Sequence, residues 1–128
     1  MKESRPLQAP MLSLMRFVAG LIFLEHGSVK LFSFPVPYGH PLPPMLFVAG
    51  IIEFFGGLLI CVGLFTVVAA FIASGEMAVG YFTAHMPHSI FPVVNGGDAA
   101  ILYCFIFFYL VFAGPGPISL DHLIWSRR

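Results

Sequence analysis

Long apolar runs separated by short polar segments dominate the chain. Four such runs can be drawn, at about 11–32, 43–64, 66–84 and 97–113. A helix that crosses the hydrocarbon core of a bilayer needs roughly 17–25 residues, and each run is long enough. Because hydrocarbon offers no hydrogen-bond partner, the backbone of each run must satisfy itself as a helix. The pattern predicts an all-α integral membrane protein, a four-helix transmembrane bundle that forms one domain over residues 1–128.

The connections between these runs predict the topology. Residues 33–42 contain three prolines and residues 85–96 contain two, whereas the second and third runs almost touch at Phe65. The two long connections then lie on one side of the membrane, and the tight turn lies on the other side with both termini.

The positively charged residues predict the orientation. Only Lys30 lies near the side of the long connections, while Lys2, Arg5, Arg127 and Arg128 flank the termini. Because cytoplasmic segments carry an excess of Lys and Arg, both termini are expected in the cytoplasm.

Composition supports a membrane environment and narrows the function. The chain is 59% hydrophobic and 9% charged, whereas a soluble domain carries about 25% charged residues. Its net charge is zero and it has no basic block, so nucleic acid is not an expected partner. Cys61 and Cys104 lie alone in apolar runs and form no Cys-x-x-Cys pair, which argues against a dithiol site. The N-terminus lacks the pattern of a removable signal peptide.

Three carboxylates lie inside the apolar runs: Glu25, Glu53 and Glu76. A charged side chain at bilayer depth costs at least ~2.5–3.5 kcal/mol, so such residues face the protein interior, pair, or hold a proton. A rise of ~1.5 Å per residue puts Glu53 and Glu76 both near the middle of their helices. Two carboxylates in a medium of low dielectric do not both ionise easily, which suggests a proton-carrying or ligand-holding pair. The alternative is a structural role, in which they join helices by hydrogen bonds.

The other candidates are basic residues. Arg16 lies ~8 Å inside its helix by the same rise, from where it could reach either central glutamate. Arg16 and Lys30 together could hold an anionic ligand, or they could pair with carboxylates or extend toward the headgroups. His26 could donate to a quinone carbonyl or shuttle protons, since its ordinary pKa of about 6.5 suits that role. A hydrogen bond from His26 to a neighbouring helix is the structural alternative.

Two features point away from this interior. His85 and His88 flank a proline, and this spacing is weak support for metal or haem ligation, so no metal site is predicted. Glu25 is nine residues from Arg16 and therefore lies on the opposite side of the helix. If Arg16 faces the bundle, Glu25 faces a second protomer, a partner protein or the outer loops.

Short motifs follow one another along nearly the whole chain: FLEHG at 23–27, EFFGG at 53–57, GEMA at 75–78, NGGD at 95–98 and GPGP at 114–117. Together they resemble the helix signatures of the DoxX family of small bacterial membrane proteins. Three positions depart from the relatives: Glu25 replaces a usual glutamine, Asp98 a common glutamate, and Val67 a frequent arginine.

The resemblance implies a multi-pass protein of the bacterial inner (cytoplasmic) membrane. Members of this family are associated with redox chemistry, and one branch is a subunit of a thiosulfate:quinone oxidoreductase. The leading hypothesis is therefore a membrane subunit of a redox system that interacts with quinone through a polar site inside the bundle. Its expected catalytic residues are Glu53, Glu76 and His26. Its expected ligand-binding residues are Arg16, Lys30, Asp98, Asn95 and His85.

Two alternatives use the same residues differently. Buried charges also mark ion and proton paths, so a transporter or channel for a small solute is possible on this pattern. Four helices would then need a homo-oligomer to form a conduit. The other alternative is a membrane anchor that recruits a soluble redox enzyme through its outer loops. The expected partners are thus the lipid bilayer, a quinone or small redox substrate, a soluble oxidoreductase and further copies of the chain.

Overall fold

The computed structural model describes residues 5–125, which are helical or irregular and contain no strand. The main helices are α1 (Gln8–Phe32), α2 (Pro44–Ile51), α3 (Gly57–Val62), α4 (Thr66–Gly80) and α6 (Asp98–Ala113). Two π-helical turns, η1 (Ile52–Gly56) and η2 (Tyr81–His85), and a 3-10 turn, η3 (Met86–His88), extend them. Two short helices complete the chain, α5 (Pro92–Asn95) and α7 (Leu120–Trp125). The all-α prediction is confirmed, and each apolar run is helical.

Within residues 5–125, three helical segments are long and apolar enough to cross a membrane. They are Gln8–Phe32, Pro44–Val62 and Thr66–His88, with 25, 19 and 23 residues. The helix Asp98–Ala113 is apolar but shorter. The third segment runs past the predicted end at 84 because η2 and η3 continue the helical path to His88. A fourth span, the single-domain assignment and the orientation of the termini remain predictions.

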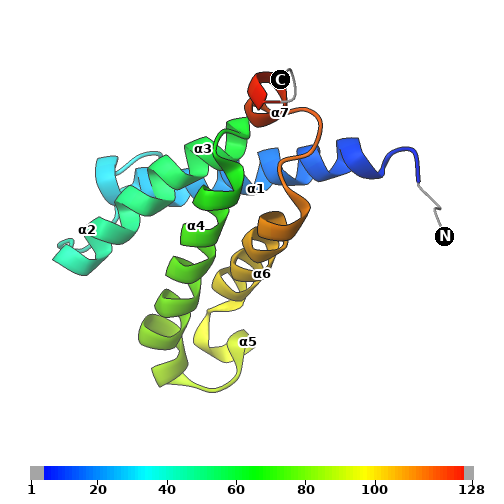
Figure 1. The fold of residues 1–128 in the computed structure, drawn as a ribbon. Coiled ribbons are helices and arrows are strands. Elements are labelled where there is room, and N and C mark those ends of the chain that lie inside the picture. The colour runs from blue at the N-terminus through cyan, green and yellow to red at the C-terminus, as the bar shows by residue number, and fades with distance from the viewer. Residues whose placement is uncertain (1–4, 126–128) are drawn as a thin grey trace.

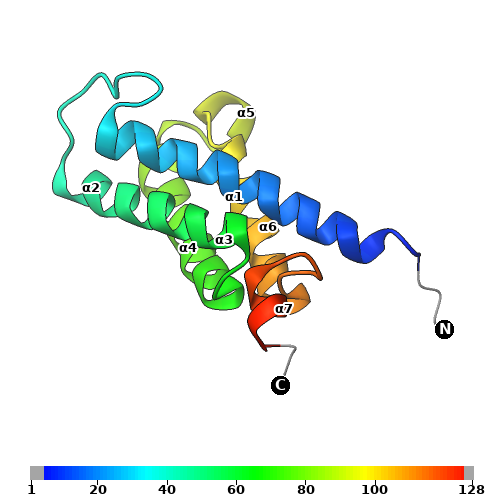
Figure 2. The same ribbon diagram turned by 90° about the horizontal axis from the view of Figure 1, so that it is seen from above.

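The helices associate as two pairs that cross. The segment α2–η1–α3 packs along α1, and α4 packs along α6. Figure 1 shows that the second pair crosses the first rather than running parallel to it. Figure 2 shows the 33–43 loop and α5 toward one end of the molecule, and α7 toward the other. The two long connections therefore share an end, as the sequence predicts.

Small residues allow the first pair to pack closely. A Cβ added to Gly20 would lie 2.5 Å from the backbone nitrogen of Cys61, and one added to Gly57 would lie 2.6 Å from that of Leu24. The backbones of Cys61 and Leu24 cannot move aside for an added methyl group as a flexible side chain could. Close approach through small residues is the usual way in which membrane helices associate. Next to this contact, Phe23 and Phe107 are fully buried in the core that α1 shares with α6.

The C-terminal segment is fastened to the end opposite the long loops. The guanidinium of Arg16 donates to carbonyls in the last turn of α3 and in the tail: Ile60 O at 2.8 Å, Cys61 O at 3.3 Å, Ile118 O at 3.0 Å, and Pro115 O. The Asp121 carboxylate accepts from the backbone N–H groups of Phe65 and Thr66, at 2.8 and 2.9 Å. These bonds satisfy donors at the start of α4 that have no partner within the helix.

Candidate functional site

An ion pair joins α1 to the π-helical turn η1. Lys30 Nζ lies 2.8 Å from Glu53 Oε1, and the two side chains are 17% and 4% exposed. An isolated charge in an apolar interior is very costly, so each group makes the burial of the other tolerable. The pair places the polar site between α1 and the second helical segment.

Both π-helical turns contribute to the same region. Glu53 lies within η1, and His85 is the last residue of η2. A π-helical turn inserts a residue into an α-helix and so changes the direction of the side chains around it, and such turns are frequent at functional sites. Residues of both π-helical turns line one pocket, and this distinguishes the region from the regular α-helical backbone around it.

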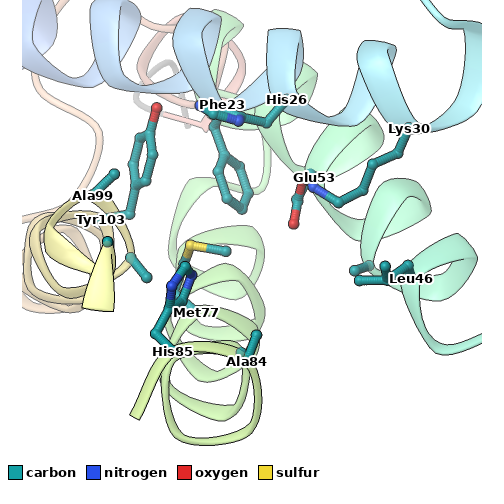
Figure 3. Close-up of a pocket in the computed structure, with 14 residues that line it drawn as sticks. Phe23, His26, Lys30, Leu46, Glu53, Met77, Ala84, His85, Ala99 and Tyr103 are labelled. Carbon is teal, nitrogen blue, oxygen red and sulfur yellow. Dashed lines mark hydrogen bonds and ion pairs between the residues drawn. The ribbon is translucent and has the colours of Figure 1, made fainter. Parts of the chain in front are cut away.

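The pocket has a volume of about 330 Å³ and lies between α1, the start of α2 and η1, the end of α4 and the start of α6. Its polar lining residues are His26, Lys30, Glu53, His85 and Tyr103, and the remaining ones are apolar or glycine. Figure 3 shows the ion pair on one side of the pocket and Tyr103 on the other, with Phe23 between them. The volume falls within the ~300–1,000 Å³ of small-molecule sites.

Aromatic rings line the pocket from its middle to the side opposite the ion pair. The ring centroids of Phe23 and Tyr103 lie 5.3 Å apart, and Tyr103 stacks on Phe107 at 5.5 Å. His26 meets the edge of Tyr103 at 6.0 Å. Among residues 5–125, the His26 ring nitrogens and the Tyr103 hydroxyl make no hydrogen bond to another residue. Neither group is therefore committed to another described residue.

Glu76 lies beside the ion pair without lining the pocket. It is close enough to Glu53 and Lys30 for their charges to interact. Its Oε1 is buried and has no hydrogen-bond partner among the described residues. The structure thus brings the two central glutamates together with one ammonium group, so the cluster has one carboxyl group more than the lysine can neutralise.

Asn95 organises the loop beside the pocket. Its Nδ2 donates to the Tyr81 hydroxyl at 3.0 Å and to Ser89 O at 2.8 Å, while its Oδ1 accepts from Gly97 N at 2.8 Å. The backbone oxygen of Asn95 lies 3.0 Å from His85 Nδ1. Both amide N–H groups of Asn95 are therefore used within the protein. The residue positions His85 at the pocket and does not line it.

The structure separates the residues that the sequence nominated. Around the pocket it gathers His26, Lys30, Glu53 and His85, with Glu76 adjacent. Arg16 does not reach the glutamates, because its donors are directed to the carbonyls near the C-terminal tail. Asp98 is exposed and outside the pocket lining.

Tyr103 was missed by sequence reasoning. It shares its apolar run with Tyr109, which also carries a hydroxyl, so composition did not single it out. Only Tyr103 lines the pocket. Within the part of the chain that the structure describes, no group of three or more His, Cys, Asp or Glu residues is placed to hold a metal ion.

Comparisons with known proteins agree with the motifs. The model of the DoxX family matches residues 11–86, which include most of α1 and all of α2, η1, α3, α4 and η2. A Haemophilus influenzae protein described only as an uncharacterized protein is 42% identical over 123 residues, covering 91% of this chain and 92% of its own length. No solved structure matches. With the family model matching more than half of its length, the chain belongs to the DoxX family.

Proposed function

We propose that this DoxX protein is a membrane subunit of a redox system and that its pocket binds the ring of a quinone. One observation carries the proposal: one pocket among apolar helices is lined by the Lys30–Glu53 ion pair on one side and by Tyr103 on the other, with the ring of Phe23 between them (Figure 3). A quinone ring is flat and apolar on its faces, and it carries hydrogen-bond acceptors at its edges. The pocket offers matching groups for both features.

The recognition would rest on aromatic contact and on three donors. Phe23 and Tyr103 present rings for offset or edge contacts, which add about 0.5–1.5 kcal/mol per pair beyond buried area. The Tyr103 hydroxyl, His26 and the Lys30 ammonium can each donate to a carbonyl oxygen. Of these, His26 and Tyr103 have no competing hydrogen bond among the described residues, so the ligand need not break one.

The glutamates would supply and receive protons. Reduction of a quinone to a quinol takes two electrons and two protons, and a soluble oxidoreductase partner would provide the electrons. Burial of two carboxyl groups beside one ammonium favours retention of a proton on the cluster. In this proposal Glu76 holds one of the two protons and Glu53, at the pocket wall, passes it to the ligand, while the second proton comes from water. Proton transfer needs donor and acceptor within hydrogen-bond reach, directly or through one water.

Binding of a short-tailed benzoquinone to the purified protein in mild detergent tests the proposal. Glu53→Gln and Tyr103→Phe should each weaken binding about tenfold, which corresponds to ~1.4 kcal/mol. Asp98→Asn is the matched control for loss of one carboxylate, because Asp98 is exposed and outside the pocket lining. Equal affinity of the wild type, Glu53→Gln and Tyr103→Phe would refute quinone binding in this pocket. Solute flux in proteoliposomes without a partner would support transport instead.

The membrane-anchor alternative has one specific observation in its favour. The segment beside the pocket exposes four apolar side chains, Ile90, Phe91, Val93 and Val94, at 66%, 64%, 81% and 69%. Such a group fits a partner surface or the membrane interface. An anchor would tolerate Tyr103→Phe but would lose its soluble partner when residues 90–94 are made polar, and co-purification of the two proteins measures this.

A further inference from the structure

A second, apolar groove lies beside the pocket. It has a volume of about 320 Å³ and runs between α1 and α6. Its walls are aliphatic except for the ring of Tyr103, with Val18 and Ile22 on one side and Leu102 and Ile106 on the other. We call it the α1/α6 groove. It exists because α6 packs mainly on α4 and contacts α1 only slightly.

The α1/α6 groove adjoins the polar pocket. Two residues, Ala99 and Tyr103, line both spaces. Figure 3 shows Ala99 and Tyr103 together at one edge of the pocket, on α6. Ala99 carries only a methyl group, so the ring of Tyr103 is the one large side chain that lines both spaces.

The groove faces outward along a helix that is long and apolar enough to cross the membrane. Val18 and Ile22 are 44% and 43% exposed on α1, and Leu102 is 62% exposed on α6. From Met15 to Ile22 the α1 wall extends for roughly 10 Å at ~1.5 Å per residue. This wall leads away from the long loops and toward the interior of the apolar segments. A molecule dissolved in the bilayer can therefore approach it without crossing a polar surface.

We propose that the α1/α6 groove holds the hydrocarbon tail of the molecule whose polar ring occupies the pocket, and that the ring enters sideways from the bilayer past Ala99 and Tyr103. The inference rests on the proposed function, since the tail is that of a prenylated quinone. The order of the surfaces in space matches such a molecule: aliphatic walls lie along the groove, aromatic rings lie where the two spaces meet, and the donors and the ion pair lie beyond them. A uniformly apolar occupant would gain nothing from the pocket, and a polar solute would gain nothing from the groove.

Two quinones with the same ring test the inference, one with a long prenyl tail and one with a very short tail. Ile22→Trp narrows the groove at a residue that does not line the pocket, and Ile106→Trp does so from the opposite wall. Leu21→Trp is the matched control, because Leu21 is 40% exposed on α1 and lines neither space. Size-exclusion profiles and thermal unfolding establish that each variant is folded.

We expect either groove variant to weaken binding of the long-tailed quinone about tenfold while the short-tailed quinone binds within twofold of the wild type. Leu21→Trp should change neither affinity. Unchanged binding of the long-tailed quinone in both variants overturns the inference and leaves the proposed function standing. Failure of both quinones to bind the wild type overturns both. If a groove variant loses both quinones together with its oligomeric state, the groove is a contact with a second copy, and the inference is overturned. If a groove variant loses only a retained phospholipid, the groove is a lipid site, and the inference is also overturned.

Discussion

Lys30 on α1 and Glu53 on the π-helical turn η1 form an ion pair with a nitrogen–oxygen distance of 2.8 Å, and both side chains are largely shielded from solvent. The pair serves structure and site together. It ties the first helix to the second helical segment, and it gives the pocket its charged wall. Because the two groups neutralise each other, they can be buried among apolar helices without a compensating anion or cation from outside.

Removal of one member of this pair should destabilise the protein. Lys30→Met leaves the Glu53 carboxylate buried without its partner, which typically costs about 3–5 kcal/mol. The double variant Lys30→Met with Glu53→Leu should recover most of that loss, because neither charge is then left unpaired. Unfolding in mixed detergent micelles measures both. A double variant as unstable as Lys30→Met alone would contradict the ion-pair explanation.

Arg16 should control the C-terminal segment and leave the pocket unaffected. Arg16→Met removes donors to Ile60, Cys61, Pro115 and Ile118. A hydrogen bond from a charged donor contributes a net ~1.5–3 kcal/mol at most. We therefore expect Arg16→Met to lower the free energy of unfolding by about 3 kcal/mol in total. Limited proteolysis should then cleave between α6 and α7, where the wild type is protected. Continued protection in Arg16→Met would show that other contacts fasten the segment.

The contact between α1 and α3 should not tolerate a methyl group. Gly57→Ala would place a Cβ 2.6 Å from the backbone nitrogen of Leu24, so the helices must separate, at a cost of about 1–3 kcal/mol. Gly75→Ala is the control, since a Cβ there meets nothing within 4 Å. Because alanine favours a helix over glycine by up to ~1 kcal/mol, Gly75→Ala should be neutral or stabilising. Thermal unfolding that ranks the two variants equally would refute the close-packing argument.

Glu76 should carry the proton of the carboxyl cluster. A protonated side chain shows a carboxylic C=O stretching band in the infrared spectrum, which an ionised carboxylate lacks. We expect that band to be present at neutral pH and to disappear in Glu76→Gln, with little change in stability because glutamine is neutral and nearly the same size. Glu25→Gln, at an exposed position, is the comparison and should keep the band. A band that persists in Glu76→Gln would place the proton elsewhere.

The sequence predicted the helices well because apolar run length is a strong signal. The predicted run at 97–113 corresponds to α6, and the run at 43–64 corresponds to Pro44–Val62. The π-helical turns could not be predicted, because they depend on how Glu53 and Tyr81 pack against neighbouring helices. The short helix α7 was not anticipated either, since its position depends on Asp121 reaching the start of α4.

The candidate site was predicted in part. Depth along the helices brought Glu53 and Glu76 to one level, and the structure places them together. Depth along the helix did not predict the partners of Arg16, because a long side chain can turn toward either end of its helix. Here the carbonyls of Ile60 and Ile118 are close enough to bind it, and the glutamates are not needed. The place of Tyr103 at the pocket follows from the fold, which puts α6 across the pocket from η1.

Photolabelling with a reactive benzoquinone analogue, followed by peptide mass spectrometry, tests the central claim most directly. The account predicts labels on the pocket residues Phe23, Met77 and Tyr103, which unlabelled quinone suppresses and Glu53→Gln diminishes. Labels spread over exposed lipid-facing residues such as Phe71 and Phe112, without competition by unlabelled quinone, would contradict it.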